Sequence, residues 1–119
     1  MREIKFYKSQ SGKCPVEDFL DTLSSMQSQK VTWVLQLIEE LPSVPSKYLK
    51  KLVNTDDIWE IRIVLATDTF RLLGFFDGSQ LIVLNHAFQK KSQKTPRQAI
   101  KTAEKRKQDY FNRRGDTNE

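Results

Sequence analysis

The apolar residues of this chain recur with a helical period in its first third and with a strand period in its middle. Residues 3–8 alternate apolar and polar positions, which predicts a short strand. Pro15 suits the first position of a helix, and two apolar stripes with intervals of three and four follow it. The stripes are Val16, Phe19, Leu20 and Leu23, and then, after the Ser24–Ser25 break, Val31, Val34, Leu35, Ile38 and Leu41, with Trp33 on the flank. Because Pro42 and Pro45 end the second stripe, the pattern predicts a helical hairpin that covers one face of a sheet.

From Ile58 the period changes to two, which predicts three further strands, at residues 58–65, 70–76 and 80–88. Asp77-Gly78 is a strong two-residue hairpin signal, and a comparably tight turn at Thr67-Asp68 would join the first two strands. In that register one face carries the core, formed by Trp59, Ile61, Ile63, Leu65, Phe70, Leu72, Phe76, Leu81 and Val83.

The opposite face is predicted to carry the charged residues of these strands, namely Glu60, Arg62, Arg71 and His86. A slip of one residue would put Arg62 or Arg71 in the core, where an unpaired guanidinium is costly. The same face also holds Leu73, Phe75, Ile82 and Leu84. We therefore expect the C-terminal helix to cover part of it.

That helix has its own start signals. Thr95 can act as N-cap, Pro96 suits the first turn, and Gln98 completes a Thr-x-x-Gln capping box. Its thin apolar stripe is Ile100, Ala103 and Tyr110 or Phe111. The segment 43–57 reads as a linker, in which Lys47, Lys50 and Lys51 are interpreted as a solvated helical turn rather than as a basic extension.

Length and pattern together predict one α+β domain over residues 1–113, with the order β-α-α-β-β-β-α, a small antiparallel sheet and a disordered tail over 114–119. The chain has 119 residues, of which 38% are hydrophobic, and this supports one modest core. No segment approaches the roughly 20 apolar residues of a membrane span or forms a signal peptide. We expect a cytoplasmic protein without a membrane partner.

The positive charge is local. Residues 89–114 contain ten Lys and Arg against two acidic residues, although the whole chain carries only +5. A nucleic acid is the first partner to consider, because phosphate contacts release counterions and give sequence-independent affinity. A solvated helix face is the alternative reading of such a helix.

Cys14 and His86 are each the only residue of their type. A single cysteine excludes an intrachain disulfide, and with one histidine the chain lacks a zinc-type ligand set, so we expect no metal and no cofactor. Cys14 precedes Pro15 and is interpreted as a helix-start residue rather than as a nucleophile.

The charged face has two interpretations. Glu60 could pair with Arg62 or Arg71 as an ordinary cross-strand ion pair, and His86 could be a hydrogen-bonded strand-end residue. Alternatively, two arginines, a carboxylate and an imidazole beside Lys90 and Lys91 supply what RNA cleavage without a metal needs. A base takes the 2′-hydroxyl proton, cations meet the pentavalent phosphate, and the 5′-oxygen is protonated or stabilised as it leaves. The residues alone leave both interpretations open.

Three segments, Ile58–Arg62, Phe70–Leu73 and His86–Pro96, resemble the phage-derived HigB-like branch of the RelE toxin superfamily. The resemblance covers nearly the whole chain, and the last segment is the most specific. It implies a RelE-like fold and the toxin of a type II toxin–antitoxin pair. Such toxins are ribosome-dependent mRNA interferases that inhibit translation, and 2′-hydroxyl attack leaves a cyclic phosphate and a 5′-hydroxyl. The implied partners are mRNA, the ribosome and a HigA-like helix-turn-helix antitoxin, which also represses the shared operon.

The resemblance also implies roles for individual residues. Arg71 matches the strand arginine that contacts the scissile phosphate, and Arg62 and Lys91 keep the positive charge found at their positions in relatives. Glu60 stands where RelE has a lysine thought to act as base, so Glu60 and His86 compete as base candidates. Tyr110 has no secure match to the C-terminal tyrosine of some relatives. The remaining implied phosphate contacts are Lys90, Lys91, Lys94, Arg97 and Lys101, and Lys90 and Lys91 are also candidates for the acid.

Two other functions fit the same residues. A non-catalytic module could hold RNA, the ribosome or an antitoxin without cutting. A pure interaction protein could dock its basic helix on an acidic partner, in which case RNA affinity would be weak and insensitive to salt.

Overall fold

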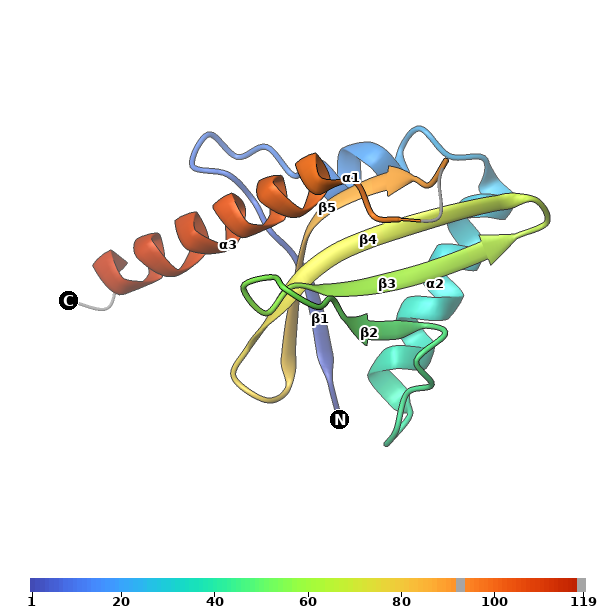
Figure 1. Cartoon of the computed structure of the whole chain (residues 1–119), viewed down its shortest axis with the longest axis horizontal. Coiled ribbons are helices and arrows are strands. Elements are labelled where there is room, and N and C mark those ends of the chain that lie inside the picture. Colours follow the sequence, from blue (N-terminus) through green and yellow to red (C-terminus); the bar gives the residue numbers. More distant parts are fainter. Residues whose placement is uncertain (92–93, 118–119) are drawn as a thin grey trace.

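A five-stranded sheet with helices on both faces forms the part of the chain that the structure, a computed structural model, describes (Figure 1). This part comprises residues 1–91 and 94–117, with side chains as far as Arg114. The elements are β1 (Glu3–Phe6), α1 (Pro15–Leu20), α2 (Ser25–Glu40), β2 (Leu49–Lys51), β3 (Trp59–Leu65), β4 (Asp68–Asp77), β5 (Leu81–Gln89) and α3 (Arg97–Thr117). In Figure 1, α3 crosses the near face of the sheet, and α2 lies behind it. The predicted α+β fold is confirmed.

The sheet has the strand order β1-β5-β4-β3-β2 and is mixed, because β1 pairs parallel to β5. The prediction of an entirely antiparallel sheet was therefore wrong at this one edge. The other edge, β2, lies within the segment interpreted as a linker. Lys50 and Lys51 belong to this strand and pair with Glu60 and Trp59, so the interpretation as a helical turn was wrong for them. Three residues, two of them lysines, give too short an apolar pattern to indicate a strand.

The two N-terminal helices cover one sheet face, as predicted. At the start of α2 the Ser24 hydroxyl accepts a hydrogen bond from the amide of Gln27 (3.2 Å), and the Gln27 side chain accepts one from the amide of Ser24 (2.9 Å). This capping box satisfies two amides that the first turn would leave unpaired. The core beneath the helices contains Val16, Val31, Val34, Ile38, Ile61, Ile63, Phe70 and Leu72.

The first hairpin keeps the predicted facing of its residues. Leu65 pairs with Asp68, so the two loop residues are Ala66 and Thr67, one position earlier than predicted. Ala66 adopts a left-handed conformation (φ 55°), as such a tight turn requires.

The second hairpin departs from the prediction in two places. Asp77 pairs with Leu81, so the loop has three residues, Gly78 to Gln80, rather than two. The extra loop residue places each side chain in the first half of β5 on the opposite face of the sheet from the one predicted. Leu81 and Val83 consequently face α3, which corrects their assignment to the core beneath the helical hairpin, and Ile82 and Leu84 take that place instead.

A β-bulge at Asn85 then restores the predicted facing. Gly74 pairs with Leu84 and Leu73 pairs with His86, so Asn85 is the extra residue of β5. The loop and the bulge each add one residue, so the side chains of β5 after Asn85 return to the faces that were predicted. His86 therefore lies on the same face as Glu60, Arg62 and Arg71, as the sequence predicted.

Asn85 and two small residues fix α3 to the sheet. The Asn85 side-chain amide donates to the carbonyl of Ala103 (2.8 Å), and Arg106 donates to the Asn85 carbonyl (2.7 Å). Ala99 and Ala103 are buried against the α3 face of the sheet. Ile100, which the predicted stripe included in place of Ala99, is only half-buried.

Both ends of α3 differ from the sequence prediction. The carbonyl of Pro96 accepts hydrogen bonds from the amides of Ala99 and Ile100, so Pro96 rather than Thr95 is in the N-cap position. The helix continues to Thr117, beyond the boundary at Arg113. Asn118 and Glu119, together with Ser92 and Gln93 of the His86–Pro96 segment, lie outside the described residues. Within residues 1–91 and 94–117, no helix has the length and apolar character needed to cross a membrane.

Replacing Asn85 with Ala tests the attachment of α3. We expect the free energy of unfolding to fall by about 1–3 kcal/mol, because the variant removes the hydrogen bond to Ala103 inside a buried interface. Urea denaturation followed by circular dichroism measures this. Gln89→Ala is the control, because Gln89 is an exposed residue of the same strand, and we expect a change within about 0.5 kcal/mol. Equal effects of the two variants would show that Asn85 does not hold the helix.

Candidate phosphate site on the sheet face

A buried ion pair forms the centre of the face that carries α3. Glu60 of β3 and Arg71 of β4 are 3% and 5% exposed, and the Arg71 guanidinium donates a hydrogen bond to one oxygen of Glu60. The Thr95 hydroxyl donates to the other oxygen. Because both carboxylate oxygens already accept hydrogen bonds, the geometry suits Glu60 to orienting Arg71 better than to removing a proton.

Arg71 retains an unused donor. Its Nε is buried and has no hydrogen-bond partner in the described part of the chain. A buried N–H without an acceptor costs about 1–3 kcal/mol, so such a group calls for an explanation. A guanidinium that a carboxylate holds and that still has an unused donor can bind a phosphate oxygen, which is a strong acceptor for arginine.

Two further cations lie beside this pair. Arg62 is directly opposite Arg71 in the β3–β4 register and is exposed. Lys90 follows β5, and its amide donates to the carbonyl of Thr69 (2.7 Å). Burial lowers the pKa of the Lys90 amine, and the positive charges of Arg71 and Arg62 lower it further, although Glu60 raises it. The site thus combines an excess of positive charge with an amine that loses its proton more readily than an ordinary lysine.

His86 belongs to a different group of residues. Leu73 stands between Glu60 and His86 in the row across β3, β4 and β5. The His86 Nδ1 lies 3.3 Å from a guanidinium nitrogen of Arg106 on α3. Burial and the charge of Arg106 lower the pKa of His86 below its usual value. The two base candidates from the sequence therefore share a face but not a site.

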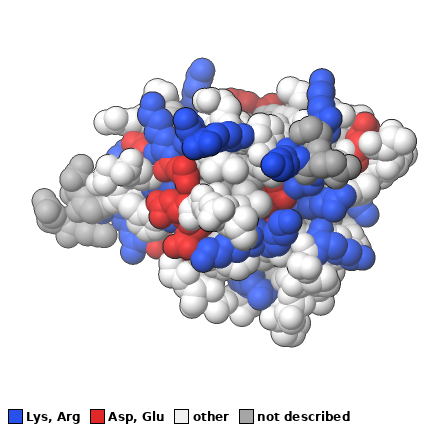
Figure 2. Space-filling view, in the orientation of Figure 1, with Lys and Arg blue, Asp and Glu red and all other residues white. Residues whose placement is uncertain are grey.

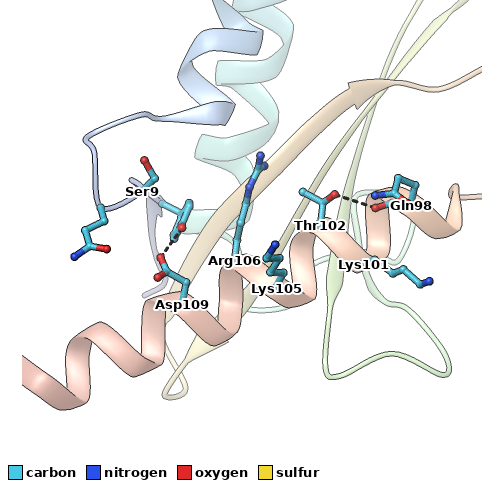
Figure 3. Close-up of a pocket in the computed structure, with 9 residues that line it drawn as sticks. Ser9, Gln98, Lys101, Thr102, Lys105, Arg106 and Asp109 are labelled. Carbon is cyan, nitrogen blue, oxygen red and sulfur yellow. Dashed lines mark hydrogen bonds between the residues drawn. The ribbon is translucent and has the colours of Figure 1, made fainter.

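The other predicted phosphate contacts are distributed along the chain beyond β5. Lys91, Lys94, Arg97 and Lys101 are exposed. Lys101 lines a pocket of about 530 Å³ between α3 and the β1–α1 connection, together with Lys105 and Arg106 (Figure 3). In Figure 3, Arg106 reaches from α3 towards β5. The Tyr7 hydroxyl donates a hydrogen bond to Asp109 (2.6 Å). This pocket is distinct from the Glu60–Arg71 pair.

The surface around the pair is basic. Figure 2 shows Lys and Arg side chains over its right-hand part, where β2, β3 and the segment before α3 lie in Figure 1. Acidic side chains gather to the left of centre. Asp56 of the β2–β3 connection pairs with Lys107 (3.5 Å), and its amide donates a hydrogen bond to Glu104 of α3 (2.9 Å). Asp56 and Glu104 are thus engaged between the β2–β3 connection and α3.

Sequence reasoning missed two residues of this arrangement. Thr95 was predicted to cap α3, but its hydroxyl binds Glu60, which is 35 positions away. Lys50, which raises the positive charge near Lys90, lies in a strand that was not predicted. Both are consequences of tertiary contacts, and only the position of Thr95 within the His86–Pro96 segment gave a signal. In residues 1–91 and 94–117, no three His, Cys, Asp or Glu side chains form a group that could hold a metal ion.

Fold and site together define a class of protein, a small RelE-like α+β domain with an arginine-centred cationic site on its sheet. The family model described as Phage derived protein Gp49-like (DUF891) matches residues 18–108. The chain belongs to this phage-derived family, which is a RelE/toxin-like family in general. The matched range includes Glu60, Arg71 and Thr95. A comparison with curated proteins found no match.

A double-mutant cycle tests the buried pair. We expect Glu60→Ala to lower the free energy of unfolding by about 3–5 kcal/mol, because Arg71 becomes an uncompensated buried charge. When Arg71 is already Ala, we expect Glu60→Ala to lower the free energy of unfolding by less, with a difference of at least about 1 kcal/mol, because this change then leaves no charge unpaired. Urea denaturation of the four proteins gives the coupling. Additive effects would contradict a direct interaction.

The pH dependence of stability tests the environment of His86. Its lowered pKa means that the unfolded chain binds the proton more strongly, so this contribution to stability is present above the unfolded pKa of about 6.5. It is lost as the pH falls through the folded pKa. We expect His86→Gln to reduce this loss in urea denaturation between about pH 7.5 and pH 5. NMR titration of the single imidazole measures the folded pKa directly, and a value at or above about 6.5 would contradict the prediction.

Proposed function

We propose that this protein is the toxin of a type II toxin–antitoxin pair and a metal-independent, ribosome-dependent mRNA endoribonuclease of the HigB-like branch. One observation carries the proposal. A buried arginine, Arg71, is held by Glu60, which also accepts a hydrogen bond from Thr95, while the Arg71 Nε has no partner among the described residues and two further cations lie beside it. Membership of a RelE/toxin-like family supports the same conclusion.

In the proposed reaction the scissile phosphate sits at Arg71, and Arg62 meets a second phosphate oxygen. Preorganised cations of this kind stabilise the charge that develops on a pentavalent phosphate. The 2′-oxygen attacks phosphorus and gives its proton to a base while the bond from phosphorus to the 5′-oxygen breaks. The products are a 2′,3′-cyclic phosphate and a 5′-hydroxyl, which takes up a proton.

Lys90 is the base in this proposal, because the other two candidates are engaged elsewhere. The oxygens of Glu60 are occupied by Arg71 and Thr95, and His86 is beyond Leu73 beside Arg106. The lowered pKa of Lys90 increases the fraction of neutral amine that can accept the 2′-hydroxyl proton. Lys91, the next residue, is exposed and is the candidate donor to the leaving 5′-oxygen.

The proposed partners follow from the same chemistry. Messenger RNA in the ribosome is the substrate, and basic surface around the site favours approach to phosphate-rich surroundings. A HigA-like helix-turn-helix antitoxin would neutralise the protein.

Primer extension on a defined mRNA tests the proposal, with the protein added to programmed ribosomes or to naked RNA. We expect cleavage by the wild type only with ribosomes. Arg62→Gln and Arg71→Ala should each reduce it by about 100- to 1,000-fold, because each removes a cation from the transition state. Arg62 is exposed, so its variant separates catalysis from folding. Lys13→Gln, at an exposed residue before α1, is the control with the same loss of charge.

Two outcomes would contradict the proposal. Full cleavage by a folded Arg71→Ala protein would remove the central residue. Absence of cleavage by a wild type that binds RNA would leave a non-catalytic RNA- or ribosome-binding module.

A further inference from the structure

A second basic hollow lies at the outer edge of the sheet, next to Arg62. It has a volume of about 290 Å³ and is formed by three segments that are separate in the sequence. Its lining, which we call the edge pocket, consists of Lys30 and Val34 of α2, Lys47 and Tyr48 before β2, and Arg62 and Val64 of β3.

The pocket exists because β2 is shorter than β3. The pairing of β2 with β3 begins at Leu49 and Ile61, and beyond it the Arg62 amide donates to the carbonyl of Tyr48 (2.9 Å). From that point the chain of residues 41–48 turns away, so Val64 of β3 is left at an uncovered edge and is 44% exposed. Val34, which is fully buried, lies behind it.

The charge of the edge pocket is of one sign. Three of its lining residues, Lys30, Lys47 and Arg62, are cations, and none is acidic. Among residues 1–91 and 94–117, no salt bridge joins any of the three to a carboxylate. Three cations that converge on one hollow repel one another, and an anion in the hollow would relieve that repulsion.

Aromatic rings hold two of these cations at the pocket. The Lys30 ammonium lies 4.6 Å from the centre of the Trp33 ring, and the Lys47 ammonium lies 4.9 Å from that of Tyr48. The two rings meet edge to face, with centres 6.3 Å apart. Trp33 is 47% exposed, so packing in the core does not account for this large ring. Tyr48 is half-buried. Aromatic rings interleaved with cations are a combination that binds single-stranded nucleic acid, because bases stack on rings while cations contact phosphates.

We propose that the edge pocket binds a phosphodiester group of single-stranded RNA that flanks the phosphate at Arg71. The inference rests on the proposed function for the identity of the substrate. Arg62 links the two places, because it lines the pocket and lies opposite Arg71 on the neighbouring strand, roughly 5 Å away along the sheet. The strand of RNA therefore runs from the cleavage site across Arg62 to the edge of the sheet, where Trp33 and Tyr48 offer surfaces for its bases.

Binding of a labelled, fully 2′-O-methylated RNA oligonucleotide tests the pocket, because this probe lacks the attacking hydroxyl and stays intact. Fluorescence anisotropy over a range of salt concentrations compares the wild type with Lys30→Gln/Lys47→Gln. We expect the double variant to bind about tenfold more weakly near 0.1 M salt and its salt slope to fall by about 0.7, the change for one phosphate contact of a single strand. The control is Lys8→Gln/Lys13→Gln, which removes the same charge from exposed positions between β1 and α1.

The outcomes separate this inference from the proposed function. If both double variants bind the oligonucleotide equally and with the same salt slope, the edge pocket is not an RNA site, whether or not the wild type cuts mRNA. If the pocket variant alone loses affinity for the oligonucleotide while the wild type fails to cleave mRNA on ribosomes, the edge pocket is an RNA site and the endonuclease proposal is wrong. If the pocket variant keeps its RNA affinity and loses binding of an acidic antitoxin segment, the surface recognises protein and the inference is overturned.

Discussion

The buried contact between Glu60 and Arg71 is the interaction on which the arrangement of this protein depends. It joins two adjacent strands and, through the Thr95 hydroxyl, ties the segment before α3 to the sheet. A guanidinium almost without solvent needs a carboxylate partner, and the carboxylate in turn needs donors for both oxygens. The same contact therefore fixes the register of β3 and β4, positions the start of α3 and presents Arg71 in a single orientation.

The face around this pair divides into regions of different character. Towards one end α3 closes the sheet, with Ala99 and Ala103 allowing close approach and Tyr110 packing on Phe75 (5.2 Å between ring centres). Near Arg71 the helix has not yet begun, and Thr95 of the segment that leads into it contacts Glu60 of the pair. Arg62 and Lys90 lie beside the pair. The fold thus places the positive charges of Arg62 and Lys90 beside Arg71, where they favour the binding of a polyanion. His86 lies apart from them, beside Arg106.

The second hairpin shows why the sequence could place His86 on the correct face without the correct register. The Asp77-Gly78 signal indicated a two-residue loop, but the loop has three residues, and the bulge at Asn85 compensates for the extra one. Nothing local marks the bulge, because the Asn85 side chain finds its partner on α3 at Ala103, 18 positions away. Leu81 and Val83, which lie before the bulge, were consequently assigned to the wrong face, whereas His86 was not.

The sequence by itself determined the helical hairpin, the three long strands, the shared face of Glu60, Arg62 and Arg71, and the resemblance of three segments to RelE-type toxins. The helices, the strands and the shared face follow from hydrophobic periodicity and from the cost of burying an unpaired guanidinium, both of which are local or single-residue properties, whereas the resemblance rests on the residues of those three segments. Only the tertiary structure decided that β1 runs parallel to β5, that β2 exists, that Thr95 binds Glu60 and that Lys30, Lys47 and Arg62 surround one hollow. Each of these depends on contacts between residues distant in the chain, whose energies no local pattern encodes.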